Sequence, residues 1–338
     1  QTRKGPSVYH WIRNEKWPHE DLELDLMNGA DALDEEGQVD LLTQASMASI
    51  PYALDQCITY LESRDSFLYT HDCGIADKED EICQKLLEQN FDKPTGRARD
   101  LDALRYLKDR GRSKNKTGII RMIGQLLVPS AEIEIFRGKL QTVKLTETIN
   151  EAWNYSRPAD LDPSTRPLWD HLPAPQPHYA AGFSPYAFTS EQHDALIPFL
   201  GGFEQTSIWK GTENMLFPFL TAEAKSGQAS LEIADRQNAH SMTRALRGVV
   251  ELFKLAQCED ELHRKILGFS ISHDDHEVRI YAHYPVIEKG RVRFHRHQVT
   301  VLIFTRPSEA DRWGSYHLVL AVYHRWAPEH FKFLCSAH

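Results

Sequence analysis

Several common sequence signals are missing from this chain of 338 residues. No apolar run approaches the roughly 18 residues that cross a bilayer as a helix, and the first 20 residues hold no apolar block of signal-peptide type. Gly-rich phosphate loop, GxSxG and HExxH motifs are absent, and no internal repeat is visible. These absences argue against a membrane protein and against the common nucleotide-binding, esterase and zincin classes.

Cysteine is also scarce, with five residues and no CxxC spacing. An odd, sparse set favours reduced thiols in an intracellular protein, nuclear or cytoplasmic. Cys57, Cys73 and Cys83 with His71 are a candidate zinc set, but their irregular spacing favours buried thiols. Because the chain starts at Gln1 and not at Met, a removed upstream segment stays open, and with it a secreted or host-directed interaction protein.

The net charge of −9 argues at first against a nucleic-acid partner, whose affinity comes largely from neutralised phosphates. The acidic excess, however, is concentrated near the N-terminus, where residues 19–42 hold nine acids and no Lys or Arg. Residues 96–121 show the opposite bias, with nine Lys or Arg and three Asp. That basic stretch is either a surface facing phosphates or a solvated helix followed by a mobile loop.

Apolar spacing of three and four predicts a mainly helical first half. The predicted helices cover residues 40–63, 80–92, 100–110, 117–128 and 144–156. Residues 157–177 contain six prolines and predict an extended linker. We expect an acidic lead with a helical region over residues 1–116 and a second domain over 117–338.

From Tyr179 onward the pattern changes to strands. Apolar runs predict a short strand at Tyr179 and further strands over 216–225, 266–272, 277–287 and 291–304, the last three forming an antiparallel meander. Between the second and third strands, residues 230–257 carry one long amphipathic stripe. The predicted fold class is therefore α/β (α+β), a mixed central β-sheet flanked by helices, with a helical N-terminal part.

The strand "LFPFLTAEAK" ends with a carboxylate and an ammonium on one face. Side chains alternate along a strand, so Glu223 and Lys225 emerge together while Ala222 and Ala224 point to the opposite layer. A carboxylate there can hold a divalent cation, and a neighbouring ammonium can orient water or stabilise charge on phosphate. An ordinary Glu/Lys pair at a sheet edge is the alternative. The following helix supports the functional interpretation, because Gln237, Ser241 and Arg244 give it a polar face.

An ordered set of motifs resembles the PD-(D/E)xK nuclease-like superfamily and, within it, an uncharacterised domain common in fungal proteins. The matching segments are "PQPHYAAGF", "FPFLTAEAKSG", "ADRQNAHSM" and "FSISHDDHEVRIYAHY", and the likeness covers about residues 117–330. The resemblance implies a restriction-endonuclease-like core, in which an Asp from one strand and the (D/E)xK of the next bind Mg²⁺ for nucleic-acid cleavage. It also implies an acid on the first core helix, here 144–156, which makes Glu151 or Glu147 the candidate, and it matches Gln237 to a helix Gln of RecB-like members.

One position departs from that pattern. Where the resemblance implies Pro-Asp, this chain has Pro177 followed by His178. Histidine is a poor Mg²⁺ ligand but suits Mn²⁺ or Zn²⁺ better. Three explanations stay open: another acid substitutes, with Asp170, Asp194 and Glu213 as candidates; the metal preference is changed; or hydrolysis is lost.

The histidines of the last strands are a separate candidate site. His273 and His276 fall in a predicted turn, His283 on the next strand, and His295 and His297 on one face of the last. They can approach a metal or a phosphate, or form a solvated strand face. No Cys or acid completes a regular zinc spacing, which favours the solvated face.

These observations predict a metal-dependent nuclease-like protein that cleaves DNA or RNA phosphodiesters with Mg²⁺ or Mn²⁺. Glu223 and His178 are the predicted metal ligands, and Lys225, Gln237 and Glu151 the further catalytic residues. Arg244 and Lys225 are the predicted nucleic-acid contacts. The alternative is a catalytically inactive nuclease fold that binds nucleic acid or a protein partner, with no membrane contact in either case.

Overall fold

The computed structural model describes residues 52–93, 115–140, 143–156, 172–200, 206–226, 229–306 and 308–337. All of them belong to one unit, Ile50–His338. The acidic segment 19–42, the helix predicted over 100–110 and Asp170 lie outside the described residues. The same holds for most of the basic stretch and of the proline-rich linker.

A seven-stranded mixed sheet forms the centre of the described part of the chain. Its strands are β1 (Leu145–Thr148), β2 (Tyr179–Phe183), β3 (Lys210–Thr212), β4 (Met215–Ala224), β5 (Gly268–His273), β6 (Val278–Glu288) and β7 (Arg291–Leu302). The order is β1-β2-β4-β5-β6-β7, with β3 paired to β4. Strands β4 and β5 run parallel, and the other pairs are antiparallel.

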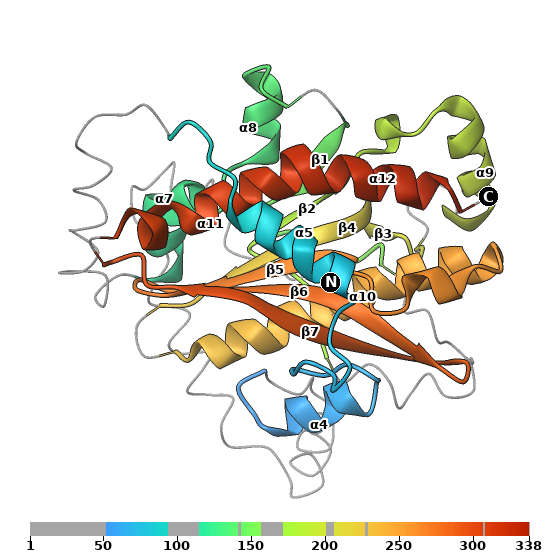
Figure 1. Cartoon of the computed structure of the whole chain (residues 1–338), viewed down its shortest axis with the longest axis horizontal. Coiled ribbons are helices and arrows are strands. Elements are labelled where there is room, and N and C mark those ends of the chain that lie inside the picture. Colours follow the sequence, from blue (N-terminus) through green and yellow to red (C-terminus); the bar gives the residue numbers. More distant parts are fainter. Residues whose placement is uncertain are drawn as a thin grey trace, which may run out of the picture. The chain divides into compact units, whose positions relative to one another are not determined.

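Helices lie on both faces of the sheet (Figure 1). They are α4 (Gln56–Glu62), α5 (Asp77–Leu87), α7 (Lys116–Leu127), α8 (Ala131–Phe136), α9 (Ser190–Leu200), α10 (Leu231–Leu255), α11 (Glu309–Ala321) and α12 (Ala327–Cys335), with the short turns η3 (Pro185–Ala187), η4 (Glu259–Leu262) and η5 (Val322–Trp326). Helices α11 and α12 cross one face, and α10 lies against the other. The predicted α+β class, a mixed central sheet flanked by helices, is confirmed. None of the helices described is both long and apolar enough to cross a membrane.

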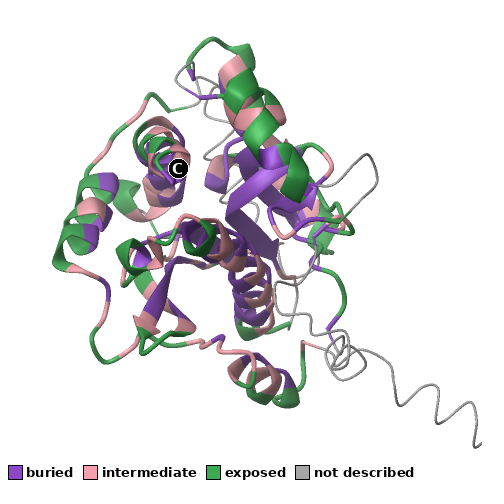
Figure 2. Cartoon of the chain, turned by 90° about the vertical axis from the view of Figure 1, so that its right-hand side faces the viewer, coloured by how far each residue is buried: buried purple, intermediate pink, exposed green. Residues whose placement is uncertain are grey.

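The unit β4–α10–β5 positions the candidate site. All ten residues of β4 are buried, because the strand lies between β2 and β5 and is covered by helices (Figure 2). Ser230 caps α10 by accepting a hydrogen bond from the Glu232 amide at 3.1 Å. The helix then returns the chain so that β5 pairs parallel to β4, as a crossover connection requires.

The predicted strands of the second half are confirmed, and so is the antiparallel meander β5-β6-β7. The β6–β7 hairpin turns at Lys289 and Gly290, whose φ angles are 49° and 76°. Helices α4 and α5 precede residue 117 and contact α10 and α11 respectively. The division into domains at residue 116 stays a prediction.

The helix predicted over residues 144–156 is wrong. Residues Leu145–Thr148 form strand β1, paired antiparallel with β2. Threonines at 146 and 148 favour a strand, and Asn150 follows with a left-handed φ of 53°, which a helix cannot contain. Sequence reasoning also missed the C-terminal helices α11 and α12.

Gly248 in α10 is required by a close approach to the neighbouring loop. A Cβ added there would lie 2.6 Å from the carbonyl oxygen of Ile208, which is backbone and cannot rotate away. We predict that Gly248→Ala lowers the free energy of unfolding by about 1–3 kcal/mol, as overpacking does. Gly124 in α7 is the matched control, since its Cβ would meet only a side-chain atom at 3.5 Å. Chemical denaturation should show Gly124→Ala unchanged or stabilised; equal losses in both variants would contradict the packing argument.

Several of the described histidines are buried in the neutral form, three of them deep in the sheet and its helices. Burial lowers the pKa of His283 and His330 to about 3 and that of His273 to about 4. In the unfolded chain an imidazole titrates near pH 6.5. Below that pH the unfolded state therefore binds protons that the folded state does not, and the folded state loses stability as the pH falls from about 6.5 towards about 4.

We predict a steep acid destabilisation from these three side chains. Each contributes about 1.4 kcal/mol per pH unit, so the free energy of unfolding should fall by about 4 kcal/mol per unit below pH 6.5. Urea titrations at pH 7.5, 6 and 5 measure this slope. A free energy of unfolding that stays flat between pH 7.5 and 5 would contradict neutral burial.

Candidate functional site

Glu223 is the second-to-last residue of the buried strand β4. It pairs with Ser272 of β5, and its side chain is 1% exposed. The apolar run before it explains the burial, because every preceding residue of the strand is also buried. Its Oε2 atom is buried and accepts no hydrogen bond from the described residues. An ionised oxygen in that state is costly, so the surroundings must supply a proton or a cation.

His178 lies directly against this carboxylate. Its Nδ1 atom is 2.8 Å from Glu223 Oε2 and 2.8 Å from the backbone nitrogen of Ala224. A backbone amide always carries its proton, so Ala224 donates and Nδ1 presents a lone pair. The Glu223 contact at the same nitrogen is then a meeting of two acceptors and not a hydrogen bond. A positive charge beside Oε2 would relieve the repulsion between these two acceptor atoms.

Lys225 and Gln237 form the second pair of the site. The Lys225 ammonium donates to Gln237 Oε1. Burial lowers the pKa of Lys225; the Glu223 carboxylate opposes this shift, and the Lys116 ammonium adds to it. The two side chains of the ExK motif therefore interact with one another and with the polar face of α10. The Lys225 amide also donates to the His273 carbonyl at 2.8 Å, which extends the parallel pairing one residue past β4.

A small polar cavity of about 130 Å³ opens beside Glu223. Its described lining consists almost entirely of polar side chains drawn from six segments: Tyr52, Lys116, Asn150, Ala174, Gln176, His178, Glu223, Gln237 and Ser241. Glu223, His178 and Gln237 therefore share one cavity, as the sequence motifs predicted. Lys225 reaches this group through Gln237.

The described lining holds one ammonium group, that of Lys116, and one carboxylate, that of Glu223. Lys116 is the first residue of α7, whose N-terminus is capped by Asn115 accepting from the Gly118 amide at 2.9 Å. Lys225 does not line the cavity, but its ammonium interacts electrostatically with both Glu223 and Lys116. Two cations against one buried anion favour an anionic ligand such as a phosphate.

The segment before β2 is fixed against the turn after β1. The Gln176 side chain donates to the Asn150 carbonyl at 2.9 Å, and the Asn150 amide donates to the His178 carbonyl at 3.2 Å. The left-handed conformation of Asn150 makes this pairing possible. His178 is thereby held at the start of β2 with its ring against Glu223.

Buried polar contacts fix α10 on the sheet below the cavity. Asn238, next to Gln237, accepts from the Thr221 hydroxyl at 2.8 Å and donates to the Ile271 carbonyl and the Ser272 hydroxyl at 2.9 and 3.0 Å. One amide thus joins the helix to β4 and to β5. Because every one of its groups is paired and buried, it sets the register of the helix.

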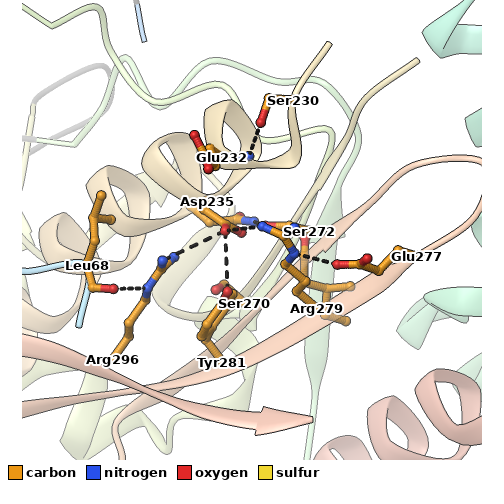
Figure 3. Close-up of polar contacts among 12 residues, drawn as sticks. Leu68, Ser230, Glu232, Asp235, Ser270, Ser272, Glu277, Arg279, Tyr281 and Arg296 are labelled. Atoms are coloured by element: carbon orange, nitrogen blue, oxygen red, sulfur yellow. Dashed lines mark hydrogen bonds and ion pairs between the residues drawn. The ribbon is translucent and has the colours of Figure 1, made fainter. Parts of the chain in front are cut away.

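A second network lies further along the same interface (Figure 3). Asp235 is buried, and its Oδ2 atom accepts from Arg279 at 3.2 Å and from the Tyr281 hydroxyl at 3.3 Å. Arg296 points at the same carboxylate, 3.8 Å away, and donates to the Leu68 carbonyl at 2.7 Å. This network ties α10 to β6, to β7 and to the chain that follows α4.

The remaining predicted acids do not line the cavity. Glu151 is exposed in the coil after β1, so the predicted helical acid is absent together with its helix. Glu147 of β1 accepts hydrogen bonds from Ser130 and Tyr179 at 2.7 and 2.9 Å, and the Ser130 bond joins β1 to the N-terminus of α8. Asp194 is exposed on α9, and Glu213 is paired with Lys210 at 3.1 Å.

Arg244 lies near the cavity without lining it. The pKa of its neighbour His240 is lowered to about 3, mainly by burial and in part by the charge of Arg244. The same charge opposes the rise that burial produces in the pKa of Tyr52. A nucleic-acid contact at Arg244 stays a prediction.

The histidines of the last strands do not form a metal centre. His295 is buried, not solvated as expected, and stacks on Phe67 with ring centroids 4.8 Å apart. His283 is buried and hydrogen-bonded to Ser270 at 2.7 Å. All five cysteines are free, and among the described residues no three His, Cys, Asp or Glu side chains are grouped as a metal site.

Sequence reasoning missed several residues of the cavity wall. Tyr52, Lys116, Asn150 and Gln176 come from segments far from the ExK motif along the chain. No local motif marks Tyr52, Lys116 or Asn150, since the fold alone brings them together, and Gln176 lies in the quoted segment "PQPHYAAGF" without having been given a role. Lys116 carries a partial signal, because it belongs to the basic stretch identified above.

Comparisons with known proteins add one assignment. No curated protein and no solved structure matches this chain. One family model matches residues 103–338, which is more than half of the sequence, and nothing in that match concerns nuclease activity. The chain belongs to the family described as Domain of unknown function (DUF7924).

Proposed function

We propose that the cavity beside Glu223 hydrolyses phosphodiester bonds of DNA or RNA with Mg²⁺ or Mn²⁺. The observation that carries this proposal is Glu223 Oε2, which is buried, lacks a hydrogen-bond donor and contacts a lone pair of His178. A divalent cation in the cavity would satisfy that oxygen. The PD-(D/E)xK resemblance of the ordered motifs supports the same chemistry, as a likeness only.

The residues present fit a weakly held, hard cation. Mg²⁺ commonly binds through one or two carboxylates while keeping water and substrate phosphates as its other ligands. Glu223 supplies one carboxylate, and Asn150 and Gln176 add neighbouring amide side chains to the wall. His178 accepts from the Ala224 amide at Nδ1, so its neutral ring carries the proton on Nε2 and offers no lone pair to a cation. This geometry does not fit the predicted role of His178 as a metal ligand.

The other side chains take defined roles in this proposal. When bound, the cation would polarise a phosphate oxygen and acidify water. Lys225, whose pKa is lowered by burial, would orient the attacking water or stabilise the developing charge, and Gln237 fixes its ammonium. Lys116, which lines the cavity, would contact the phosphate.

A second candidate function is a non-catalytic phosphate binder. It is favoured by the excess of ammonium groups over carboxylates in the site and by the single carboxylate ligand. In that case nucleic acid would bind in a salt-sensitive way without being cleaved. A protein partner, and a nuclear or cytoplasmic location, stay predictions from the sequence.

Glu223→Gln should abolish metal-dependent cleavage. The amide keeps the shape of the side chain but removes the charge that would hold the cation, so we predict a loss of at least about 100-fold. The assay uses plasmid, single-stranded DNA and RNA, each with Mg²⁺ or Mn²⁺. Asp194→Asn is the matched control, since Asp194 is an exposed acid outside the cavity. Cleavage that survives Glu223→Gln unchanged refutes the assignment.

His178→Asp should tighten the cation site. A second carboxylate beside Glu223 is predicted to lower the Mg²⁺ concentration for half-maximal cleavage by about 10-fold. Thermal unfolding must be followed in parallel, because the Ala224 amide loses its present acceptor. If the natural chain is inactive and the variant cleaves, the non-catalytic function is correct for the natural chain. An unchanged Mg²⁺ dependence in a folded variant contradicts the role given to position 178.

A further inference from the structure

The position of Glu223 restricts what can reach it. The carboxylate is 1% exposed and lies beside a cavity of only about 130 Å³. The described walls come from the chain before α4, the start of α7, the turn after β1, the segment before β2, β4 and α10. A phosphate must therefore enter a recess surrounded by protein, and not lie across an open groove.

Double-stranded nucleic acid fits such a recess poorly. Its phosphates are held on the outside of a stiff, stacked rod, and moving one nucleotide inward requires unstacking and unpairing. A single strand has no such constraint, because its backbone is flexible and its bases are free to turn onto protein side chains.

Tyr52 provides a fixed aromatic wall for such a base. The buried Arg236 guanidinium donates to the Tyr52 and Leu54 carbonyls at 3.0 and 3.1 Å and pairs with Asp55 at 2.8 Å. The Tyr52 hydroxyl shares a hydrogen bond of 2.8 Å with His240 Nδ1. The segment before α4 is thus fastened to α10 on either side of Gln237, and Tyr52 is held where it lines the cavity.

We infer that the cavity selects single-stranded nucleic acid, with Lys116 facing a phosphate and Tyr52 stacking on an adjacent base. The inference rests on the proposed function in that it places nucleic acid in the same cavity. It names the substrate class that the proposed function leaves open. Aromatic stacking with phosphate neutralisation is the usual combination by which proteins hold single strands without reading their sequence.

The test is a binding measurement that does not depend on cleavage. Fluorescence anisotropy is recorded in EDTA at one fixed salt concentration, with labelled single-stranded DNA, single-stranded RNA and duplex DNA of equal length. We expect a single strand to bind at least 10-fold more tightly than the duplex, and the two single-stranded probes report whether DNA or RNA is preferred. Equal or tighter duplex binding, or no binding of either single strand, overturns the inference.

Variants of Tyr52 test the stacking role. Tyr52→Ala should weaken single-strand binding by between about 5-fold and 100-fold, the range for loss of one stacked base, and leave duplex binding unchanged. Tyr52→Phe keeps the ring and loses only the hydrogen bond to His240, so it should bind single strands more tightly than Tyr52→Ala does. Tyr186→Ala is the control, because Tyr186 is 79% exposed and is not among the residues that line the cavity.

The Tyr52→Ala variant and the cleavage assay together separate the stacking role, the single-strand preference and the proposed hydrolysis. An unaffected Tyr52→Ala overturns the stacking role. If Tyr52→Ala does not fold, the single-strand preference of the natural chain still decides the inference. Single-strand binding without metal-dependent cleavage would refute the proposed hydrolysis while supporting this inference, so the two failures are distinguishable.

Discussion

The buried carboxylate of Glu223 is the constraint on which the site depends. A charged oxygen at the end of a fully buried strand, without a hydrogen-bond donor among the described residues, destabilises the fold unless something positive sits beside it. Its nearest nitrogen, His178 Nδ1, has its lone pair turned to the Ala224 amide. The rest of the site is an arrangement of polar groups around that unsatisfied atom.

The surrounding fold holds the side chains of the site in place, but it does not neutralise the Glu223 carboxylate. Asn238 and Asp235 fasten α10 to four strands through buried hydrogen bonds, and Gln237 lies between them on the sequence. That places the amide of Gln237 against the Lys225 ammonium and keeps both at the cavity. Lys116 arrives from a separate helix, so the positive charge of the site is assembled from two elements.

The sequence predicted those helices and strands that a local periodicity of apolar residues specifies. Strand β4, the long helix α10 and the meander follow from alternation and from a stripe of three and four, and the placement of Glu223 with Gln237 follows from them. Residues 144–156 show how such reasoning fails. Their apolar spacing fits a helix, but pairing with β2 and the left-handed Asn150 impose a strand. Tyr52 and Asn150 were beyond prediction, because only tertiary contacts bring them to Glu223.

The account is tested most directly by a crystal structure of the chain soaked in Mn²⁺, with anomalous scattering collected at the manganese edge. It predicts an anomalous peak in direct contact with Glu223 Oε2, inside the cavity bordered by His178 and Gln237. A map without such a peak, in which a lysine ammonium or another protein donor satisfies Oε2, would contradict it.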